Sequence, residues 1–570
     1  MAENGQDPAQ VLEVGGRLPI LTLGAFLAEI AKRHGDRVAM VAPDGRRTSY
    51  LELEAETRQL ARALVAAGVA KGTRVALLAG NDDDWVRAFF AVGLIGGVLV
   101  PVNTFATQPE RDYILRHSDA ALLLATPTLL QHAYLDELLS AHSELGAGRP
   151  GALQCPALPQ LRRVVSLDDG APLPGVQSRA DLLAGSQSVS EVLLDAIGAE
   201  VLPSDDGIIV YTSGTTARPK AIVHRQRAML VNGLRFSGWM GLEPTDRVFT
   251  AQPFFWTAGI AMSLISTLDA GACLLLQPTF EPAKALDRIE RERATVVHAW
   301  AHQHKAMAED ASAPGRDLGS LRRVAADSPL AKIAGMRPEK DAWGLQGSYG
   351  LSETFTIFAT LPADTPRDLR IEKSGLALPG NQLRIVDPDT GASLPTGEQG
   401  EIAVKGYTLM RGYYKVDPER TFDADGYFHT GDGGFVDADG YLHWTGRISD
   451  MIKTGGANVS PVEIQDALLG YEPLRVGMPV GVPHPALDEV VVLCAVRRED
   501  VPPVTEQQIR DHLRKHLAAY KVPRRVLFFD AEELAYTGNQ KIPSAPLRAK
   551  ALARLRAEAA EIEGHVYGPG

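Results

Sequence analysis

The sequence predicts an α/β protein: a large N-terminal domain of helix-covered, mostly parallel sheets, followed by a small α+β domain. Three observations lead to this prediction. Helix-like and β-rich segments alternate from residue 21 to about residue 201. Gly, Asp and Pro then break residues 374–445 into short β runs, which indicates a small β-rich subdomain. A new alternation of helices and strands follows, so we place the domain boundary at Asp450 and expect domains of residues 1–449 and 450–570.

The first elements follow from the spacing of apolar residues. Residues 51–69 (LELEAETRQLARALVAAGV) have helical spacing and stop near Gly68, and residues 71–81 are typical of a strand and a loop. The most apolar window, residues 88–102, is shorter than the roughly 20 residues of a membrane-spanning helix. It contains Gly-Gly and reaches Pro101, so we expect a buried helix that runs into a buried strand.

Later segments continue the pattern. The runs LLLATPTLL, RRVVSL and GIIVYTS predict further strands, with irregular loops within residues 152–175. In the C-terminal domain, VEIQDALLG predicts a helix, VGMPVGVPH and EVVVLCAVRRED predict strands, and EQQIRDHLRKHLAAY predicts an amphipathic helix. The segment LRAKALARLRAEAAEIEG indicates a last helix.

Composition narrows the class of protein. The chain has 570 residues, 45% of them hydrophobic and 22% charged, with a net charge of −12. This negative charge argues against a broad nucleic-acid surface, and the polar N-terminus does not resemble a secretory signal. Cys155, Cys273 and Cys494 are far apart and form no CxxC pair, so they predict neither disulfides nor a zinc site. These features are typical of a cytoplasmic protein without transmembrane segments.

A loop at residues 211–220, YTSGTTARPK, follows one of the predicted strands. It lacks the Walker spacing, because its Lys follows Pro rather than Gly. Its hydroxyls, its glycine and its cationic end are nevertheless suited to phosphate. On the loop alone, an ordinary polar turn is an equal alternative. The candidate phosphate-binding residues are Thr212, Ser213, Gly214, Thr215, Thr216 and Lys220.

Four later stretches favour the phosphate interpretation: SYGLSET (348–354), YFHTGD (427–432), GRISDMIKTGGANVSP (446–461) and TGNQKI (537–542). With the loop, and in this order, they resemble the adenylate-forming superfamily, in particular the acyl-CoA synthetases of the AMP-dependent synthetase and ligase family. The resemblance spans nearly the whole chain. It implies that a carboxylic acid and ATP form an acyl-adenylate with release of pyrophosphate, and that a thiol then displaces AMP.

The resemblance also implies roles for single residues in ATP binding. Glu353 matches the position that binds Mg²⁺, for which one carboxylate is chemically sufficient. Ser352 matches a hydroxyl that contacts the α-phosphate, and Tyr349 matches the aromatic ring that stacks on adenine. Asp432 and Arg447 match residues that contact the ribose. Without the resemblance, each of these residues would be an ordinary core or surface residue.

The second group of implied roles lies in a mobile C-terminal domain. Lys541 matches a late lysine that bridges the substrate carboxylate and the α-phosphate, where its charge opposes the developing negative charge. Asp450 matches the hinge. After rotation about it, Lys453, Gly455 and Gly456 would line the path of the thiol, where glycine permits close passage.

Three departures from the family pattern concern the loops of the site: Ala217, Asp327 and Gln540 stand where the family usually has glycine or a glycine-rich segment. None removes a charged catalytic group, so we expect activity. If position 217 needs a positive φ, the cost of alanine is about 1 kcal/mol or somewhat more.

The stretch QPFFWTAGI (252–260) limits the class of acid that the protein could use. Relatives that activate amino acids carry an Asp in the matching stretch, and this one has no acidic residue, which disfavours an α-amino acid. An apolar pocket would suit a fatty, alicyclic or aryl acid. The alternative for each aromatic residue is a plain core position. The candidate pocket walls are Phe255, Trp256, Trp300, Phe355 and Phe358.

The leading hypothesis is therefore an acyl-CoA synthetase that uses Mg²⁺, ATP and CoA. The alternative is a stand-alone adenylation enzyme that loads an acyl carrier protein. A nucleotide-binding protein without catalysis is disfavoured, because Glu353, Asp432, Arg447 and Lys541 are all present. Oxidation of the luciferase type is not excluded by the motifs. The oligomeric state, monomer or homodimer, stays open.

Overall fold

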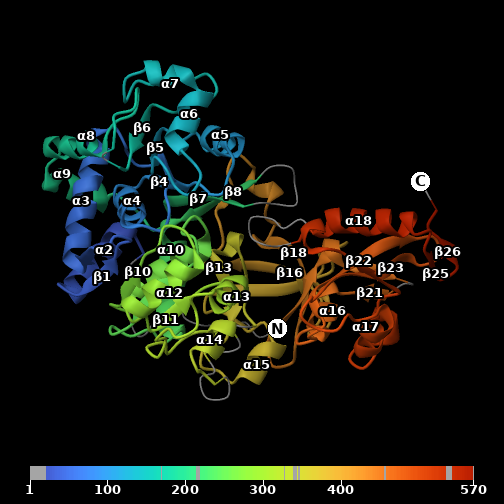
Figure 1. Ribbon diagram of the computed structural model, residues 1–570. Helices are drawn as coiled ribbons and strands as arrows, with labels where there is room; N and C mark the ends of the chain where they lie inside the picture. The colour runs from blue at the N-terminus through green and yellow to red at the C-terminus, as the bar shows by residue number, and fades with distance from the viewer. Residues whose placement is uncertain are drawn as a thin grey trace. The chain divides into compact units, whose positions relative to one another are not determined.

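The computed structural model divides into two compact units (Figure 1). The first comprises Met1–Leu383 and Val404–Phe428, and the second Arg384–Ala403 and His429–Gly570. The structure describes residues 21–168, 170–212, 219–325, 328–337, 343–344, 347–454, 457–534 and 542–568.

The main sheet of the first unit has the strand order β17-β8-β7-β4-β3-β5-β6. Pairing is parallel from β7 through β6, whereas β8 pairs antiparallel with both β7 and β17. The predicted parallel α/β sheet is thus confirmed. The strands are β3 (Arg74–Leu78), β4 (Val98–Pro101), β5 (Leu122–Ala125), β6 (Arg163–Ser166), β7 (Asp206–Thr212), β8 (Lys220–Arg225) and β17 (Gly412–Tyr413).

A second sheet of this unit has the order β11-β9-β10-β1-β2 and is parallel except for the pairing of β1 with β2. A small antiparallel sheet, β12-β13-β14, lies in the same unit. The strands of these two sheets are β1 (Val38–Val41), β2 (Arg47–Ser49), β9 (Arg247–Thr250), β10 (Cys273–Leu275), β11 (Val296–His298), β12 (Tyr349–Leu351), β13 (Thr356–Thr360) and β14 (Leu376–Ala377).

Helices of the first unit bury apolar faces against these sheets. Helix α4 is buried from Trp85 to Leu94 and leads into β4, as the apolar window predicts. The helices are α2 (Leu23–His34), α3 (Tyr50–Ala66), α4 (Asp83–Leu94), α5 (Gln108–His117), α6 (Tyr134–Ala141), α7 (Ser143–Ala147), α8 (Arg179–Ala184), α9 (Glu191–Ala199), α10 (Gln226–Trp239), α11 (Ser266–Asp269), α12 (Pro282–Arg291), α13 (Ala301–Glu309), α14 (Pro329–Ile333) and α15 (Arg367–Glu372), with short helices η1 (Gly185–Ser188), η2 (Gly259–Ile265), η3 (Ser352–Thr354) and η4 (Pro418–Arg420).

The second unit contains most of the sheet β15-β16-β18-β19 and a mainly antiparallel sheet, β21-β20-β23-β22, in which β24 joins β23 in parallel. Helix α18 packs Leu547, Ala551 and Leu555 into its core. Its elements are β15 (Asn381–Val386), β16 (Gly400–Gly406), β18 (Phe428–Val436), β19 (Leu442–Arg447), β20 (Ile452–Thr454), β21 (Ala457–Val459), β22 (Leu474–His484), β23 (Asp488–Arg497), β24 (Arg525–Phe528), β25 (Glu561–Ile562), β26 (His565–Val566), α16 (Pro461–Ala467), α17 (Glu506–Leu513), α18 (Ser544–Ala557), η5 (Ile448–Asp450), η6 (Ala519–Lys521) and η7 (Ala531–Glu533).

The division into compact units does not fall at residue 450. Strand β19 and helix α16 belong to one unit, in which Ser460 Oγ donates to the carbonyl oxygen of Thr445. A hinge is a boundary of movement rather than of compactness, so the boundary at Asp450 stays a prediction. Helix α17 ends at Leu513, earlier than the apolar pattern to residue 520 predicts. Among the described residues, no helix combines the length and apolar character needed to cross a membrane.

Candidate active site

Glu353 lies in the short helix η3, directly after β12. Its Oε1 accepts a hydrogen bond of 2.8 Å from the hydroxyl of Tyr413. Its backbone carbonyl accepts a second bond, 2.7 Å, from the amide of Met410. Residues 410–413 therefore hold both the backbone and the carboxylate of Glu353, and one carboxylate oxygen remains for a cation or water.

Lys220 reaches the same tyrosine from the neighbouring strand. It begins β8, pairs with Thr212 across the sheet, and places its Nζ 5.0 Å from the ring centre of Tyr413. Tyr413 thus contacts both charged groups: its ring faces the exposed ammonium group of Lys220, and its hydroxyl bonds to the Glu353 carboxylate. The sequence alone does not indicate Tyr413, although GYY (412–414) is a conspicuous aromatic pair after the predicted phosphate-binding segments.

A buried histidine forms a hydrogen bond with the backbone of Ser352. His224 of β8 donates through Nε2 to the carbonyl oxygen of Ser352 at 2.7 Å, and its ring packs edge-on against Phe355 at 4.9 Å. Burial lowers the pKa of His224 to about 4, so the ring is neutral at pH 7. The only sequence signal for His224 is a histidine inside an apolar strand, which does not indicate this role.

The backbone turns sharply after Glu353. Phe355 and Thr356 have φ angles of 51° and 84°, a region that costs about 1–2 kcal/mol for each such residue. Asn232 of α10, fully buried, donates through Nδ2 to three carbonyl oxygens there: Thr354 at 3.2 Å, Phe355 at 2.7 Å and Ile357 at 3.3 Å. This amide stabilises the strained turn that presents Ser352 and Glu353.

Tyr349 opens β12 and is 5% exposed. The glycine that follows it is required by close packing, since a Cβ on Gly350 would lie 2.0 Å from the carbonyl oxygen of Thr356. The stacking role of Tyr349 stays a prediction, because a core tyrosine would be buried to the same degree.

Asp432 and Arg447 lie opposite each other on β18 and β19 of the second unit. Arg447 Nε lies 2.9 Å from Asp432 Oδ1, and its Nη1 donates to the carbonyl oxygen of Thr430 at 2.8 Å. Asp432 is 3% exposed, while nearly half of the Arg447 side chain is exposed. The two predicted ribose contacts therefore form one ion pair with a buried acid and an accessible base.

The predicted hinge residue, Asp450, and the predicted thiol-path residue, Lys453, both form hydrogen bonds with side chains later in the chain. Asp450 Oδ1 accepts a bond of 2.7 Å from the hydroxyl of Ser544, at the start of α18. The amide of Lys453 donates to Glu489 Oε2 at 2.9 Å, and the other carboxylate oxygen of Glu489 pairs with Arg548 of α18. Helix α18 is thus bonded to the segment around the predicted hinge.

The aromatic candidates for the acid pocket lie in three places in the first unit. Phe255 and Trp256 contact each other edge-on at 5.0 Å, just before the π-helix η2, a form that often occurs at functional sites. Trp300 precedes α13, and its indole nitrogen has no hydrogen-bond partner among the described residues. Phe355 and Phe358 are fully buried, as core residues are. Their role as pocket walls stays a prediction.

Several predicted site residues lie outside the described residues, as do the three departures from the family pattern. They are Ser213, Gly214, Thr215, Thr216, Gly455, Gly456, Lys541, Ala217, Asp327 and Gln540. Within the described residues, the first unit brings together Lys220, Tyr413 and Glu353, and the second unit brings together Asp432 and Arg447.

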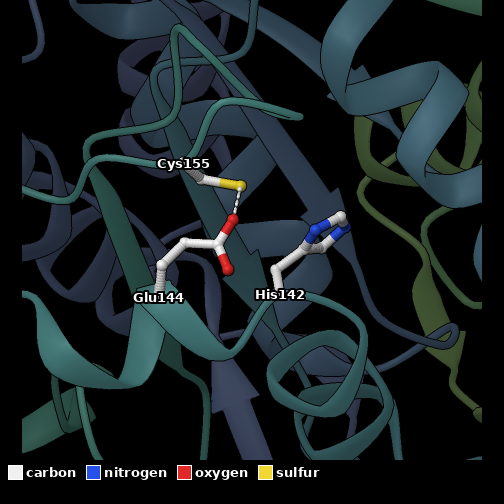
Figure 2. A group of neighbouring side chains, drawn as sticks. All are labelled: His142, Glu144 and Cys155. Atoms are coloured by element: carbon white, nitrogen blue, oxygen red, sulfur yellow. Dashed lines mark hydrogen bonds between the residues drawn. The ribbon is translucent and has the colours of Figure 1, made fainter.

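A separate group lies at the connection of α6 and α7: His142, Glu144 and Cys155 present ligand atoms within 4.8 Å of one another. Figure 2 shows the thiol and the Glu144 carboxylate pointing toward each other, and Cys155 Sγ donates to Glu144 Oε1 at 3.3 Å. His142 Nε2 lies 3.0 Å from a carboxylate oxygen of Asp112. Burial raises the pKa of the Cys155 thiol, so the group is a hydrogen-bonded cluster rather than a thiolate site.

Comparison with known proteins decides the family. The model of the AMP-binding enzyme family matches residues 27–414, well over half of the chain, and that of the AMP-binding enzyme C-terminal domain matches residues 463–541. The chain belongs to the AMP-binding enzyme family. Its two matched regions cover the phosphate loop and Glu353 in one case and Lys541 in the other.

Relatives of this AMP-binding enzyme are ligases of carboxylic acids. It is 32% identical to a feruloyl-CoA synthase of an Amycolatopsis species, over 91% of this chain and 95% of the relative. It is 31% identical to a methyl-dioxo-octahydro-indenyl-propanoyl:CoA ligase of Mycobacterium tuberculosis, over 89% and 95%. Among solved structures, the anthranilate CoA ligase AuaEII in complex with anthranoyl-AMP matches with a TM-score of 0.77 and 27% identity, over 96% of this chain and 100% of that one.

These matches establish the class of enzyme. This AMP-binding enzyme is an AMP-forming acid–thiol ligase with a large N-terminal and a small C-terminal domain. ATP and CoA are substrates that fit its family. The predicted acyl-CoA synthetase resemblance is therefore confirmed, while the roles of single residues remain predictions.

Proposed function

We propose that this enzyme activates an apolar carboxylic acid, fatty, alicyclic or aryl, as its acyl-adenylate and transfers the acyl group to CoA. The products are acyl-CoA, AMP and pyrophosphate. The observation that carries the proposal is the arrangement of Lys220 and Glu353 on Tyr413, in the region matched by the AMP-binding model. It would offer a cation to the phosphate oxygens and a carboxylate to the metal ion that accompanies them.

In the first half-reaction, a carboxylate oxygen attacks the α-phosphorus, and the bond from that phosphorus to pyrophosphate breaks. Lys220 and Lys541 would offset the negative charge that develops on the phosphoryl oxygens, and the Ser352 hydroxyl would donate to the α-phosphate. Thr212 and its neighbours Ser213, Gly214, Thr215 and Thr216 would supply further donors from the loop.

Mg²⁺ fits Glu353. The carboxylate keeps one oxygen beyond its bond to Tyr413, and Mg²⁺ commonly takes one or two protein carboxylates and completes its shell with phosphate oxygens and water. When bound, the ion would neutralise charge on the triphosphate. The strained turn held by Asn232 would keep the carboxylate in place.

Nucleoside binding would use Tyr349 for the base and Asp432 with Arg447 for the ribose. A buried carboxylate can accept hydrogen bonds from two adjacent hydroxyls. Arg447, whose Nε lies 2.9 Å from Asp432 Oδ1, would place a positive charge beside this acceptor.

In the second half-reaction, the thiol sulfur attacks the acyl carbon and AMP leaves. We propose that rotation about Asp450 withdraws Lys541 and introduces Lys453, Gly455 and Gly456. The bond between Asp450 and Ser544 would have to adjust in this movement, because it spans the proposed hinge.

The apolar class of acid is supported by two features. The stretch of residues 252–260 has no acidic side chain for an α-ammonium group, and Phe255 and Trp256 form an aromatic pair there. The named relatives act on feruloyl and on indenyl-propanoyl groups, which are aryl and alicyclic. Together they favour a ring-bearing acid within the proposed range.

The test is a mass-spectrometric screen with Mg-ATP, CoA and a panel of fatty, alicyclic and aryl acids, with polar acids and amino acids included for comparison. A new acyl-CoA mass is expected and would identify the acid. Formation of acyl-AMP without acyl-CoA would contradict CoA as the acceptor and favour the alternative, a carrier protein. No adenylate from any apolar acid, with adenylate from a polar or amino acid, would overturn the proposed substrate class. A cytoplasmic location and the choice between monomer and homodimer stay predictions.

A further inference from the structure

Three side chains that the proposed function does not use come together in the first unit: His142, Glu144 and Cys155, which we call the α7 cluster. His142 is the residue between α6 and α7, Glu144 lies on α7, and Cys155 lies in the connection from α7 to β6. One nitrogen, one carboxylate oxygen and the sulfur all lie within 4.8 Å of one another (Figure 2). No CxxC pair indicates this group in the sequence, so tertiary packing alone assembles it.

The separations in the α7 cluster are close to those of ligands around one metal ion. In a tetrahedral zinc site, bonds of about 2.0–2.3 Å place the ligand atoms about 3.4–3.6 Å apart. Cys155 Sγ and Glu144 Oε1 already lie 3.3 Å apart. Since no separation exceeds 4.8 Å, the imidazole of His142 has to approach by about 1 Å, which a small rotation of the side chains supplies.

His142 gives a second, independent indication of a ligand site. It is 8% exposed, and its Nε2 is buried without a hydrogen-bond partner in the described part of the chain. Such buried, unsatisfied atoms are rare and call for an explanation. Asp112 Oδ1 lies 3.0 Å from this nitrogen, and Gln108 Nε2 donates to the same oxygen at 2.7 Å. Because metal-ligating histidines commonly direct their second ring nitrogen to a carboxylate, Asp112 of α5 is well placed to orient the ring.

The α7 cluster is open to solvent on one side. Cys155 is 3% exposed, whereas Glu144 is exposed. An ion arriving from solvent could therefore meet the Glu144 carboxylate first and then bind the buried sulfur and nitrogen. The carboxylates of Glu144 and Asp112 would offset part of its charge.

The chemistry of the ligand atoms selects the kind of ion. One sulfur, one imidazole nitrogen and one carboxylate oxygen form a borderline-soft set, which is typical of Zn²⁺ and unlike the oxygen-only sets of Mg²⁺ and Ca²⁺. Without an ion, Cys155 keeps its proton and donates it to Glu144. A coordinating thiol is deprotonated outright, so binding forms a sulfur–metal bond and releases the proton to solvent, with no change of oxidation state.

We propose that the α7 cluster binds a divalent ion of the zinc class, with His142, Glu144 and Cys155 as ligands and water in the fourth position. The ligands flank the connection from α7 to β6, so the ion would tie the start of α7 to the segment that leads into β6. An ion that binds the folded chain more tightly than the unfolded one stabilises the fold. This inference does not depend on the proposed function.

Cobalt spectroscopy tests the site directly, because Co²⁺ replaces Zn²⁺ in such sites and gives a charge-transfer absorption band when a thiolate binds it. The ion is titrated into the untagged full chain, with excess Mg²⁺ to fill oxygen-only sites. We expect one Co²⁺ per chain with a thiolate band, which is lost in C155A and persists in C273A, where the buried cysteine of β10 is removed. No band in the wild type, or equal bands in C155A and C273A, would overturn the proposal.

A second variant keeps the test decisive if loss of the buried thiol disturbs folding. Glu144 is exposed, so E144Q should fold, and its dissociation constant for Zn²⁺, measured by competition with a chelator, should rise about tenfold. The matched control is E309Q, at an exposed glutamate that ends α13. Equal affinities of E144Q and E309Q, or a millimolar dissociation constant for the wild type, would mean adventitious binding only and would overturn the proposal.

Thermal unfolding then tests whether the ion stabilises the fold. Zn²⁺ should raise the unfolding temperature of the wild type and of C273A, but not that of C155A. The same rise in all three proteins would place the ion elsewhere and would overturn the proposal.

Discussion

The hydroxyl of Tyr413 donates a hydrogen bond of 2.8 Å to Glu353 Oε1. The Nζ of Lys220 lies 5.0 Å from the centre of the ring of the same tyrosine. Tyr413 and Glu353 are 60 positions apart in the sequence. The pairing of β17 with β8 brings Tyr413 near Lys220, because it places Tyr413 opposite Ile222. The bond from the Met410 amide to the Glu353 carbonyl oxygen holds Glu353 beside the same segment. This contact is the part of the candidate site that the geometry defines most closely.

Tyr413→Phe should lower kcat/KM for MgATP about tenfold, because the variant loses a hydrogen bond to a charged group but keeps the ring under Lys220. Acid-dependent exchange of labelled pyrophosphate into ATP measures this. The matched control is Tyr414→Phe, whose hydroxyl donates to Asp119 at 2.9 Å, away from Glu353. Equal effects of the two substitutions would show that the bond to Glu353 has no special role.

Asn232→Ala should destabilise the first unit by about 1–3 kcal/mol, because buried carbonyl oxygens of the strained turn lose their donor. Urea unfolding measures the change. Exchange activity should fall as well, under conditions where the variant is fully folded. Unchanged activity in a folded variant would mean that the turn keeps Glu353 in place without this amide.

Lys541→Ala should lower adenylate formation about 10²–10³-fold, the usual effect of losing one contact to the charge that develops at the reacting centre. Thiolysis of a supplied acyl-adenylate should persist. Lys550→Ala, on the exposed face of α18, serves as the control. Equal loss of both half-reactions would contradict the role given to Lys541.

Asp450→Pro should slow the second half-reaction more than the first, because proline fixes φ at the proposed hinge. It also removes the acceptor of the Ser544 hydroxyl, so Ser544→Ala is the matched variant that loses only this bond. Single-turnover measurements separate the half-reactions. Normal rates for both in Asp450→Pro would mean that the hinge lies elsewhere.

The stability of the first unit should depend on pH through His224. Its pKa in the folded state, about 4, lies below the ordinary value of 6.5, so the unfolded chain binds more protons and stability falls as the pH drops from 6.5 towards 4. His224→Gln should remove about 1.4 kcal/mol per pH unit from this slope. Urea unfolding of both proteins between pH 6.5 and 5 measures it; parallel slopes would contradict a buried, neutral His224.

Local elements could be predicted because their determinants are close in sequence. The helix at residues 51–69 is α3, which begins at Tyr50 with a capping box between Ser49 and Glu52. The apolar window of residues 88–102 is the end of α4 and β4. Such signals need no knowledge of the rest of the chain.

The missed residues depend on long-range pairing. Tyr413, His224 and Asn232 reach the Glu353 turn from β17, β8 and α10, and nothing in their immediate sequence indicates it. The glycine and hydroxyls of the loop after Thr212 are indicated by residue type alone, whereas Lys541 is indicated by motif resemblance.

The most direct test of acyl-adenylate formation uses an acid from the screen labelled with ¹⁸O in both carboxylate oxygens. If the carboxylate attacks the α-phosphorus, each turnover transfers one ¹⁸O atom to AMP, and mass spectrometry of the AMP detects it. We expect one label per AMP and none in pyrophosphate. Label in inorganic phosphate, with ADP as the nucleotide product, would mean an acyl-phosphate intermediate and would contradict acyl-adenylate formation.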